Sequence, residues 1–405
     1  MSGLQGKRIL FGITGSIAAY KAAEWVRSLV KEEAIVTVVM TKSAERFVSP
    51  LTFSALSGNQ VYRDMFDDDS DRVMAHINLS READVILVAP ATARSIGRLG
   101  SGIADDLLST LILAALIPVV VCPAMNSNML AHPATQQNIN RLQQYGYHLV
   151  QSGSGSLACG DTGDGRLPDW DVAREALLAV FEPKDLECRK VLITAGPTRE
   201  PLDPARFLSN RSSGKMGFAL ARTARRRGAE VTLVTGPVVL TDPPGVEVVR
   251  VTTAEEMREV VMQRARSVQV IVKSAAVADF KPAAYQGHKI KKTDQLFQLD
   301  LVKNTDILAE LGGNRIQGQV LVGFAAESRD HVGEGQRKLK EKNLDLIVVN
   351  DILGAQTGFD VETNQVTLID RTGVAVLPLL TKEDTANQIW NKVISLLHEG
   401  DVDAG

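Results

Sequence analysis

This chain of 405 residues has few aromatic side chains, no large excess of charge and no long apolar run. Aromatic residues make up 5% of the sequence, and the apolar residues are mainly Val, Leu, Ile and Ala, a composition typical of parallel sheets covered by helices. A formal net charge of -3 gives no reason to expect nucleic acid or an anionic membrane as a partner. The longest apolar run, residues 107–121, contains polar residues and a proline and is too short to span a bilayer.

Cysteine is also scarce. Cys122, Cys159 and Cys188 form an odd set without metal-ligand spacing, which suits a reducing cytosol. No secretory signal is visible ahead of the first expected strand. These features predict a soluble cytoplasmic α/β protein.

The length favours two domains, because a single hydrophobic core rarely grows beyond about 250–300 residues. One strand–loop–helix pattern begins near residue 9 and another begins near residue 191. Between them, residues 181–190 are charged, contain one proline and are typical of a linker. We therefore expect one domain over residues 1–186 and a second over residues 187–405. Each is expected to be a doubly wound, Rossmann-like parallel sheet, the second with a small antiparallel addition.

In the first half, we expect strands over residues 8–13, 35–40, 85–89 and 119–122 and helices over residues 17–31 and 104–116. The first turn lacks a G-x-G-x-x-G fingerprint, and the second strand ends at Thr41 and Ser43 rather than at a carboxylate. These hydroxyls argue against NAD and for a mononucleotide with a terminal phosphate. An ordinary capped strand–helix turn is the alternative.

Three further positions in this half could carry chemistry. His76 begins a short helical pattern, although a lone histidine often only packs or faces solvent. Asn126 follows a strand end, where it could donate to an oxyanion or simply occupy a turn. Residues 152–167, SGSGSLACGDTGDGRL, contain five glycines and indicate either a lid with Cys159 at its tip or a mobile surface loop.

Five features in this order, GSIAAYK, His76, PATA, PAMNSNM and ACGDTGDGRL, resemble the FMN-dependent cysteine decarboxylases, a family of homo-oligomeric flavoproteins with a flavodoxin-like fold. The resemblance is greatest to the phosphopantothenoylcysteine decarboxylase half of bifunctional coenzyme A biosynthesis proteins. It implies that FMN oxidises the substrate thiol, that CO2 is lost, and that reduction and protonation complete the product. The residues implied to contact FMN are Gly15, Ser16, Thr41, Ser43, Pro90, Ala91, Thr92 and Met125.

The same resemblance implies three catalytic roles. His76 would assist the oxidative decarboxylation, Asn126 would bind the departing carboxylate, and Cys159 would protonate the intermediate. A thiol is a suitable proton donor because its ordinary pKa is about 8.5. The chain departs from the family at Ser16, where glycine is frequent, and at Leu130, where an aromatic residue is frequent.

The second half opens with VLITAGPTREPLDPARFLSNRSSGKMG, residues 191–217, which predicts a strand, a loop rich in glycine and proline, and a helix after Gly214. Further strands are expected over residues 231–235, 246–251, 270–274, 320–324 and 346–349, helices over 216–227, 254–266 and 383–397, and a hairpin over 365–369 and 374–379. The sequence around Gly214 is not a Walker A loop. Lysines near residues 289 and 338 could instead hold a triphosphate, or they could form a solvated face.

The order TAGPTREPLDPARFLSNRSSGKMG, SAAVADF, KIKK, NTDIL, GFAAE, KNLD and VND resembles the phosphopantothenate–cysteine ligases of the bacterial, CTP-using type. The resemblance covers nearly all of residues 191–380. It implies that the 4′-phosphopantothenate carboxylate attacks CTP and that cysteine then displaces CMP from the acyl-cytidylate. Mg2+ would bridge the phosphates through ligands that the sequence does not identify.

In this resemblance Lys289 neutralises charge on the triphosphate, and Asn210 contacts the acyl-cytidylate. The residues implied to form the CTP site are Ala275, Asp279, Lys289, Thr305, Asp306, Ile307, Leu308, Phe324, Lys338 and Lys342. Two positions depart from the family: Lys273 replaces a small residue and Thr305 a proline. Lys273 could add a cation near CTP or extend from a strand edge into solvent. The resemblance also implies a homo-oligomer, a dodecamer.

Two other functions remain open at this point. A flavin oxidoreductase with an NAD(P)H-binding second half would share the doubly wound pattern but lacks the G-x-G-x-x-G signature. A non-catalytic flavoprotein that binds other proteins would have no need to keep the five implied catalytic residues together.

Overall fold

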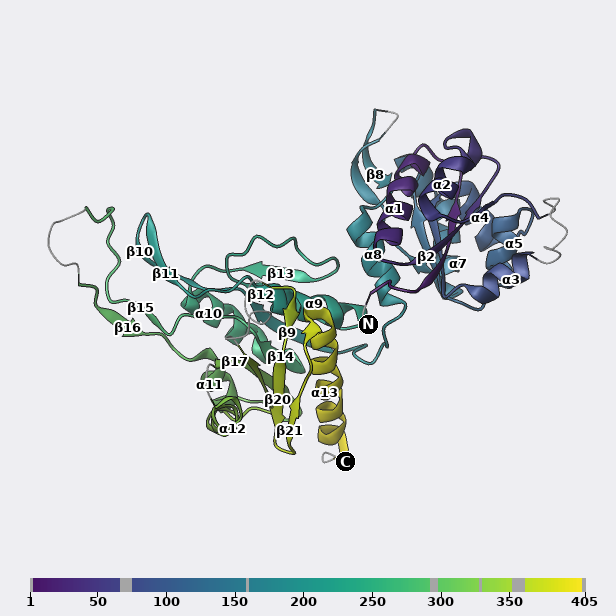
Figure 1. Ribbon diagram of the computed structural model, residues 1–405. Coiled ribbons are helices and arrows are strands. Elements are labelled where there is room, and N and C mark those ends of the chain that lie inside the picture. Colours follow the sequence, from purple (N-terminus) through teal and green to yellow (C-terminus); the bar gives the residue numbers. More distant parts are fainter. Residues whose placement is uncertain are drawn as a thin grey trace. The chain divides into compact units, whose positions relative to one another are not determined.

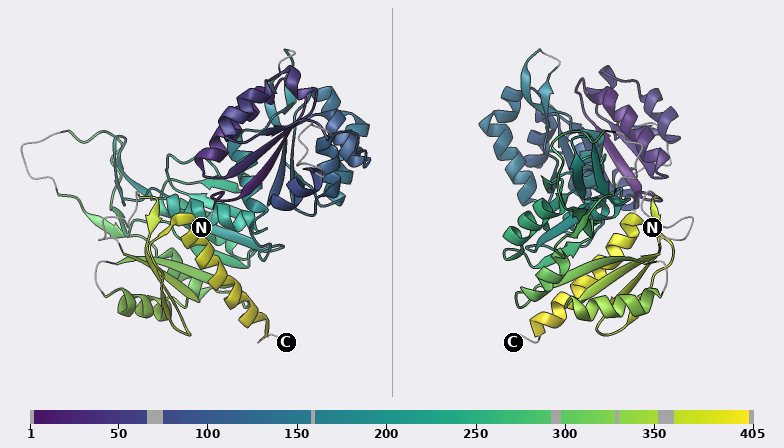
Figure 2. Two further views of the ribbon diagram at one scale, coloured as in Figure 1. Left: turned by 45° about the vertical axis from the view of Figure 1, so that its right-hand side comes forward. Right: turned by 90° about the vertical axis from the view of Figure 1, so that its left-hand side faces the viewer.

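The computed structural model describes residues 3–65, 75–157, 160–291, 298–327, 330–351 and 361–402. The chain divides into two compact units, Met1–Glu182 and Pro183–Gly405. Figures 1 and 2 show that each unit has a sheet with helices on both faces. Each unit is described below by itself.

The first unit contains a six-stranded sheet in the order β3-β2-β1-β4-β5-β6, and every pair of neighbours is parallel. Its strands are β1 (Arg8–Ile13), β2 (Ile35–Met40), β3 (Val61–Tyr62), β4 (Val85–Ala91), β5 (Val119–Pro123) and β6 (His148–Leu149). Without the short β3, the order is that of flavodoxin, and the winding reverses between β1 and β4. The four predicted strands and the flavodoxin-like fold are confirmed.

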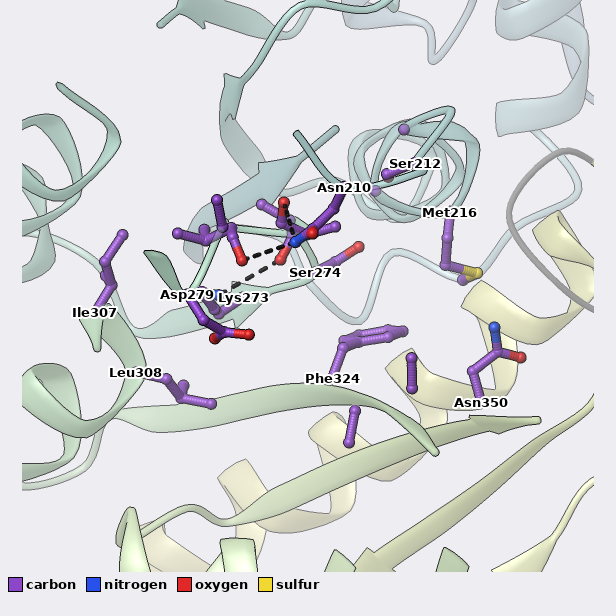
Figure 3. Close-up of a pocket in the computed structure, with 18 of the residues that line it drawn as sticks. Asn210, Ser212, Met216, Lys273, Ser274, Asp279, Ile307, Leu308, Phe324 and Asn350 are labelled. Atoms are coloured by element: carbon purple, nitrogen blue, oxygen red, sulfur yellow. Dashed lines mark hydrogen bonds between the residues drawn. The ribbon is translucent and has the colours of Figure 1, made fainter. Parts of the chain in front are cut away.

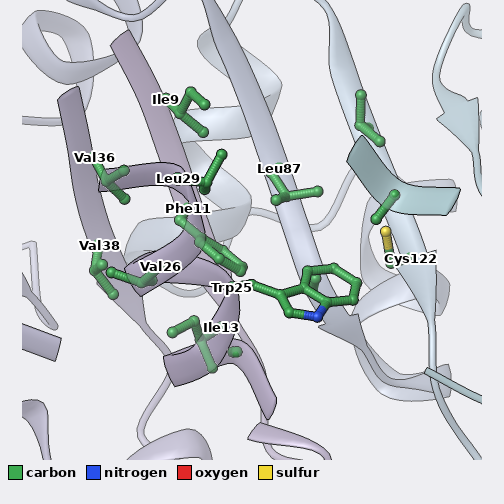
Figure 4. Close-up of a cluster of buried hydrophobic side chains, with 14 of the residues drawn as sticks. Ile9, Phe11, Ile13, Trp25, Val26, Leu29, Val36, Val38, Leu87 and Cys122 are labelled. Carbon is green, nitrogen blue, oxygen red and sulfur yellow. The ribbon is translucent and has the colours of Figure 1, made fainter. Parts of the chain in front are cut away.

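Helices cover both faces of this sheet. One face packs against α1 (Ala19–Lys31), α2 (Pro50–Ser57) and α8 (Trp170–Ala179). The other packs against α3 (Ala75–Glu82), α4 (Ala93–Gly100), α5 (Leu107–Ala114) and α7 (Pro133–Gln144). Figure 4 shows the first of these cores, where Trp25 of α1 lies beside Leu87 and Phe11. Cys122 belongs to this core, and burial raises the pKa of its thiol, so it is not a reactive cysteine.

The described parts of the glycine-rich segment form two paired strands. Strand β7 (Gly153–Ser156) pairs antiparallel with β8 (Thr162–Arg166). The Met125 amide donates a hydrogen bond to the Gly165 carbonyl over 2.9 Å. Gly165 has a φ of +121°, and a Cβ there would lie 2.2 Å from the Met125 carbonyl oxygen. At this position glycine therefore permits close packing rather than mobility.

The second unit contains an eight-stranded sheet in the order β13-β12-β9-β14-β17-β18-β20-β21. Its strands are β9 (Lys190–Ala195), β12 (Glu230–Thr235), β13 (Glu247–Arg250), β14 (Val270–Lys273), β17 (Val320–Glu327), β18 (Leu346–Asp351), β20 (Val366–Asp370) and β21 (Val374–Val376). The strands from β13 to β18 are parallel, and β20 and β21 continue the sheet antiparallel. The doubly wound sheet and its antiparallel addition are confirmed.

One face of this sheet is covered by α9 (Lys215–Arg226) and α13 (Lys382–Val402), and the other by α10 (Ala254–Ala265), α11 (Ile307–Gly313) and α12 (His331–Glu341). Trp390 of α13 is fully buried against α9. Its indole Nε1 donates to the Thr223 hydroxyl over 3.0 Å and to the Leu220 carbonyl over 3.2 Å. This buried contact fixes α13 to α9.

Residues 196–214, predicted as a loop, contain regular secondary structure, so this prediction was wrong in part. The segment contains a hairpin of β10 (Arg199–Asp203) and β11 (Arg206–Ser209). A second short hairpin pairs β15 (Phe280–Pro282) with β16 (Leu301–Lys303), and β19 (Thr363–Asn364) pairs with β22 (Leu380–Thr381). The loops after the parallel strands therefore have secondary structure of their own.

Candidate functional site

A cavity of about 320 Å3 lies at the carboxyl ends of β1, β2, β4 and β5 in the first unit. This is the edge at which open parallel sheets bind ligands, next to the point where the winding reverses. The residues that line it are Gly15, Ser16, Thr41, Ser43, Thr92, Ala93, Arg94, Ser95, Arg98, Ala124, Met125 and Met129.

Short-range contacts hold the loops around this cavity together. The buried Thr14 hydroxyl donates to the Pro90 carbonyl over 2.7 Å and accepts from the Thr92 amide over 3.1 Å. The turn after β1 also approaches the end of β2 closely, because a Cβ at Gly15 would lie 2.4 Å from the Ser43 Cβ. These contacts fix the positions of the loops that surround the cavity.

Six of the eight residues predicted to contact FMN line this cavity, and Pro90 and Ala91 do not. Ala91 is buried, and the Pro90 carbonyl is used by Thr14, so both support the wall from behind. Arg94 and Arg98 also line the cavity, although the sequence did not predict this. Arg98 is neutralised by Asp105 and Asp106, at 2.7 and 2.6 Å, whereas Arg94 is exposed and forms no ion pair with any described residue.

Of the three predicted catalytic residues of this half, only Asn126 has its side chain among the described parts of the structure. Asn126 caps helix α6 (Ser127–Ala131): its Oδ1 accepts from the Asn128 amide over 2.8 Å, and its Nδ2 donates to Asp161 over 3.3 Å. It directly follows Met125, which lines the cavity. His76 lies in the first turn of α3, but its side chain is outside the described residues, and so is Cys159.

A larger pocket of about 550 Å3 lies at the carboxyl ends of β14, β17 and β18 and the start of α9 in the second unit (Figure 3). Asn210 lines it, as do all residues of the predicted CTP site except Lys289. The predicted residues found here are Asn210, Ala275, Asp279, Thr305, Asp306, Ile307, Leu308, Phe324, Lys338 and Lys342. Segments more than a hundred residues apart thus converge on one pocket.

The pocket lining is strongly cationic. Two carboxylates, Asp279 and Asp306, line the pocket together with seven basic residues, of which Lys215 is paired with Glu362 outside the lining. The basic residues are Arg211, Lys215, Lys273, Lys303, Lys338, Lys342 and Lys382. Asp306 caps α11 and pairs with Lys342 at 2.7 Å. Partial burial alone would raise the pKa of Asp306, but the hydrogen bond from Lys342 and those from the helix amides hold it below its ordinary value. Such a pocket suits a polyanion.

Asn210 joins the hairpin loop to the loop after β14. Its Nδ2 donates to the Val277 carbonyl over 3.0 Å and to the Ala276 carbonyl over 3.4 Å, as the dashed lines of Figure 3 show. The two loops belong to neighbouring strands, because β9 pairs with β14. Asn210 is therefore held at the wall of the pocket.

Two amide side chains complete the far end of the pocket, near Phe324 and Met216. Asn350 of β18 pairs with Val366, and Asn364 of β19 lies two residues before Val366. Both amides line the pocket, and the Asn364 Nδ2 donates to the Met216 sulfur over 3.9 Å. The Oδ1 atoms of Asn350 and Asn364 are buried, and no described residue donates a hydrogen bond to them. An unpaired buried acceptor costs about 1–3 kcal/mol, so a ligand with a hydrogen-bond donor would satisfy this end of the pocket.

Neither of these two asparagines was predicted from the sequence to line the pocket. Asn350 was noted only as part of VND, and no local feature marks Asn364. The other missed residues come mainly from the start of α9 and the loops beside β14 and β16: Arg211, Ser212, Ser213, Ser274, Lys303 and Asn304. Lys289 lies in an exposed stretch after β15 and does not line the pocket, so its role stays a prediction.

The described residues contain neither a helix that could span a membrane nor a cluster of potential metal ligands. No helix among them is long and apolar enough to cross a membrane. In the same parts of the chain, no three His, Cys, Asp or Glu side chains are grouped as a metal site would require.

Both halves of the chain match known protein families. Residues 2–181 match the family described as Flavoprotein, and residues 186–397 match the DNA/pantothenate metabolism flavoprotein C-terminal domain. The coenzyme A biosynthesis bifunctional protein CoaBC of Bacillus subtilis (strain 168) is 45% identical over 398 residues, covering 97% of this chain and 98% of that protein. The CoaBC protein of Escherichia coli (strain K12) is 43% identical over 401 residues, covering 98% of each. A crystal structure of the C-terminal domain of a CoaBC protein is 40% identical, covers 53% of this chain and 99% of that one, and has a TM-score of 0.46.

Proposed function

The chain belongs to the family of coenzyme A biosynthesis bifunctional proteins, and we propose that it converts 4′-phosphopantothenate, cysteine and CTP into 4′-phosphopantetheine in two steps. Residues 187–405 ligate cysteine to 4′-phosphopantothenate, and residues 1–186 decarboxylate the resulting phosphopantothenoylcysteine with FMN. One observation supports the ligase assignment most strongly: Asn210 and nine of the ten residues of the expected CTP site line a single cationic pocket.

The chemistry of ligation explains why such a pocket is needed. A free carboxylate is a poor acyl donor, so it attacks the α-phosphorus of CTP and expels pyrophosphate to form an acyl-cytidylate. The cysteine amine then attacks the acyl carbon, and CMP leaves. Lysines around the pocket stabilise negative charge on the triphosphate and on pyrophosphate as it leaves. Mg2+ supplies further charge neutralisation when it is bound to the nucleotide.

Asn210 has a separate role in this proposal. Its amide is held against the loop after β14, where it contacts the acyl-cytidylate and serves the attack of cysteine. Lys289 belongs to a stretch outside the pocket lining, and we propose that it reaches the triphosphate when the nucleotide is bound.

The first unit fits a flavin mononucleotide through its small and hydroxyl-bearing residues. Gly15 lets the first turn approach the end of β2 closely, and Ser16, Thr41, Ser43 and Thr92 offer hydroxyls to a phosphate or ribityl chain. Bound FMN supplies the reversible oxidation of the substrate thiol. Asn126 holds the substrate carboxylate, His76 assists its loss as CO2, and Cys159 donates the proton that completes the product.

The relatives do not support the rival flavin oxidoreductase with an NAD(P)H-binding second half. We further propose that the enzyme works in the cytoplasm, in keeping with its few cysteines, and that it is a homo-oligomer, as the resemblance to its family implies.

The overall reaction is tested by mass spectrometry of products from the purified chain given 4′-phosphopantothenate, cysteine, CTP and Mg2+. The proposal expects 4′-phosphopantetheine, CO2, CMP and pyrophosphate. Accumulation of phosphopantothenoylcysteine in flavin-loaded protein would refute the decarboxylase half. Failure to consume CTP would refute the ligase half.

The role of Cys159 is tested by Cys159→Ser, with Cys188→Ser as the matched control because Cys188 is exposed and lies in the second unit. A serine hydroxyl is a much weaker acid than a thiol, so the step that returns the electrons from the reduced flavin to the intermediate should stall. We expect CO2 release to stop after about one turnover per bound flavin and formation of the aminothiol to fall by about a hundredfold. Ligation should be unchanged. Normal aminothiol formation by Cys159→Ser would exclude this cysteine as the proton donor.

A further inference from the structure

Lys273 is the last residue of β14, and its half-buried side chain lines the cationic pocket of the second unit. Its Nζ donates to the Ala275 carbonyl over 3.4 Å (Figure 3). It forms no ion pair with any residue in the described parts of the chain. The ammonium group is therefore held in the pocket wall without a carboxylate at contact distance.

The charged groups around Lys273 come from three other elements. Asp306 at the start of α11 is already paired with Lys342, which follows α12. Lys338 of α12 lines the same pocket, and Asp279 comes from the loop after β14. Because Asp306 is already paired with Lys342, the described residues compensate the charge of Lys273 incompletely. An anionic ligand would supply the missing counter-charge.

We propose that Lys273 is a further substrate-binding residue of the ligase pocket and that its ammonium group binds a phosphoryl oxygen of the nucleotide. This inference rests on the proposed function, because it takes the nucleotide of the ligase reaction as the anion. The alternative, a lysine that merely extends along a strand edge into water, does not account for an amine hydrogen-bonded to a pocket carbonyl.

The protonation of Lys273 gives this proposal a second consequence. Burial lowers the pKa of Lys273 to about 8; Asp306 and Asp279 oppose the shift, and Lys342 adds to it. The amine is therefore charged below about pH 8 and neutral above it. A bound phosphoryl group favours the charged form, so nucleotide binding should be strongest below this pKa and weaken as the pH rises through it.

The experiment is calorimetric titration of CTP into the full chain between pH 7 and pH 9.5, above the range in which phosphate groups titrate. Four proteins are compared: wild type, Lys273→Met, Lys273→Arg and Lys340→Met. Lys340 lies on α12, is exposed and does not line the pocket, so it controls for the loss of one positive charge. Arginine stays charged over the whole range.

We expect Lys273→Met to weaken CTP binding at pH 7 by about tenfold to a hundredfold, the range for a hydrogen bond to a charged group. Wild-type affinity should fall toward that of Lys273→Met as the pH rises. The affinities of Lys273→Met and Lys273→Arg should vary less over the same range, and Lys340→Met should follow wild type.

Two results would overturn the inference alone: wild-type CTP affinity in Lys273→Met at pH 7, or the same pH dependence in wild type and Lys273→Met. Absence of CTP binding by the wild-type chain would instead refute the proposed ligase function, and this inference with it. Circular dichroism shows whether Lys273→Met is folded. If it is not, the CTP affinities of wild type and Lys273→Arg are compared above pH 8: a smaller fall in Lys273→Arg supports the inference, and equal falls contradict it.

Discussion

The pockets of the two units lie at the same edge of similar sheets but differ in what lines them. Glycine, hydroxyls and short apolar side chains surround much of the first pocket, whereas seven basic side chains surround the second. A doubly wound sheet therefore determines where a ligand binds, and the residues at the strand ends determine which ligand it is. A cofactor with one phosphate needs few charges, while a triphosphate substrate needs many.

The two pockets also differ in whether their buried polar groups have hydrogen-bond partners within the protein. In the first, Thr14 fixes the neighbouring loop by accepting from Thr92 and donating to the Pro90 carbonyl. In the second, the buried oxygens of Asn350 and Asn364 have no described donor. This contrast fits a preformed cradle for a resident cofactor and an unsatisfied pocket for a substrate that binds and leaves.

The largest predicted effect separates the two pockets completely. In Asn210→Asp, a carboxylate would face the Val277 and Ala276 carbonyls to which the amide now donates. We expect ligation to fall by about a hundredfold to a thousandfold, with acyl-cytidylate accumulating, because the contact that serves the second step is lost. Decarboxylation of supplied phosphopantothenoylcysteine should be unchanged. Rates of both reactions in one preparation test this, and an equal loss of both would contradict independent sites.

Gly15→Ala tests the first pocket alone. A Cβ at Gly15 would lie 2.4 Å from the Ser43 Cβ, so the turn and the end of β2 must move apart. Overpacking of this kind costs about 1–3 kcal/mol, and we expect flavin binding to weaken by about tenfold or more while ligation is retained. Flavin absorbance per chain measures the effect.

Gly97→Ala is the matched control for that experiment. Gly97 lies on α4, and an added Cβ would meet only the Asn138 side chain at 3.6 Å, an ordinary contact. Flavin content should match the wild type. Equal losses in Gly15→Ala and Gly97→Ala would show that the first pocket does not depend on the close approach at Gly15.

A smaller effect is expected from Asn364→Leu in the second pocket. Removing a buried oxygen that has no described partner should leave the free energy of unfolding unchanged or raise it by about 1 kcal/mol. Losing a ligand hydrogen bond should raise the KM of one ligase substrate by about two- to tenfold. Thermal melts and ligase kinetics measure the two quantities. A destabilised protein with unchanged KM would mean that Asn364 serves the fold instead.

The sequence predicted the parallel strands well because their apolar runs are buried on both faces of a sheet. It failed where loops have their own structure. The prolines between Gly196 and Gly214 suggested an irregular loop, yet strands β10 and β11 form there. The glycines of residues 152–167 suggested mobility, whereas Gly165 permits a close approach to Met125. Local composition alone does not reveal such long-range contacts.

Within the sites, residues in segments that resemble a known family could be predicted from the sequence. Residues that strand pairing brings into a pocket could not. Asn210 and Phe324 lie in segments that resemble a known family, and both line the pocket. Asn364 joins Asn350 only because β18 and β20 pair antiparallel in one register. Arg94 lines the first pocket because α4 begins there, directly after the PATA motif, and the prediction stopped two residues short of it.

The central claim is that each unit carries out one of two successive reactions and that the two sites work independently. The most direct measurement is product analysis of an equal mixture of Gly15→Ala and Asn210→Asp chains given 4′-phosphopantothenate, cysteine, CTP and Mg2+. Gly15→Ala alone should accumulate phosphopantothenoylcysteine, and Asn210→Asp alone should make almost none. The mixture should form 4′-phosphopantetheine at a rate well above either variant, because the intact second unit of one supplies the intact first unit of the other. A mixture no faster than the better single variant would contradict the claim.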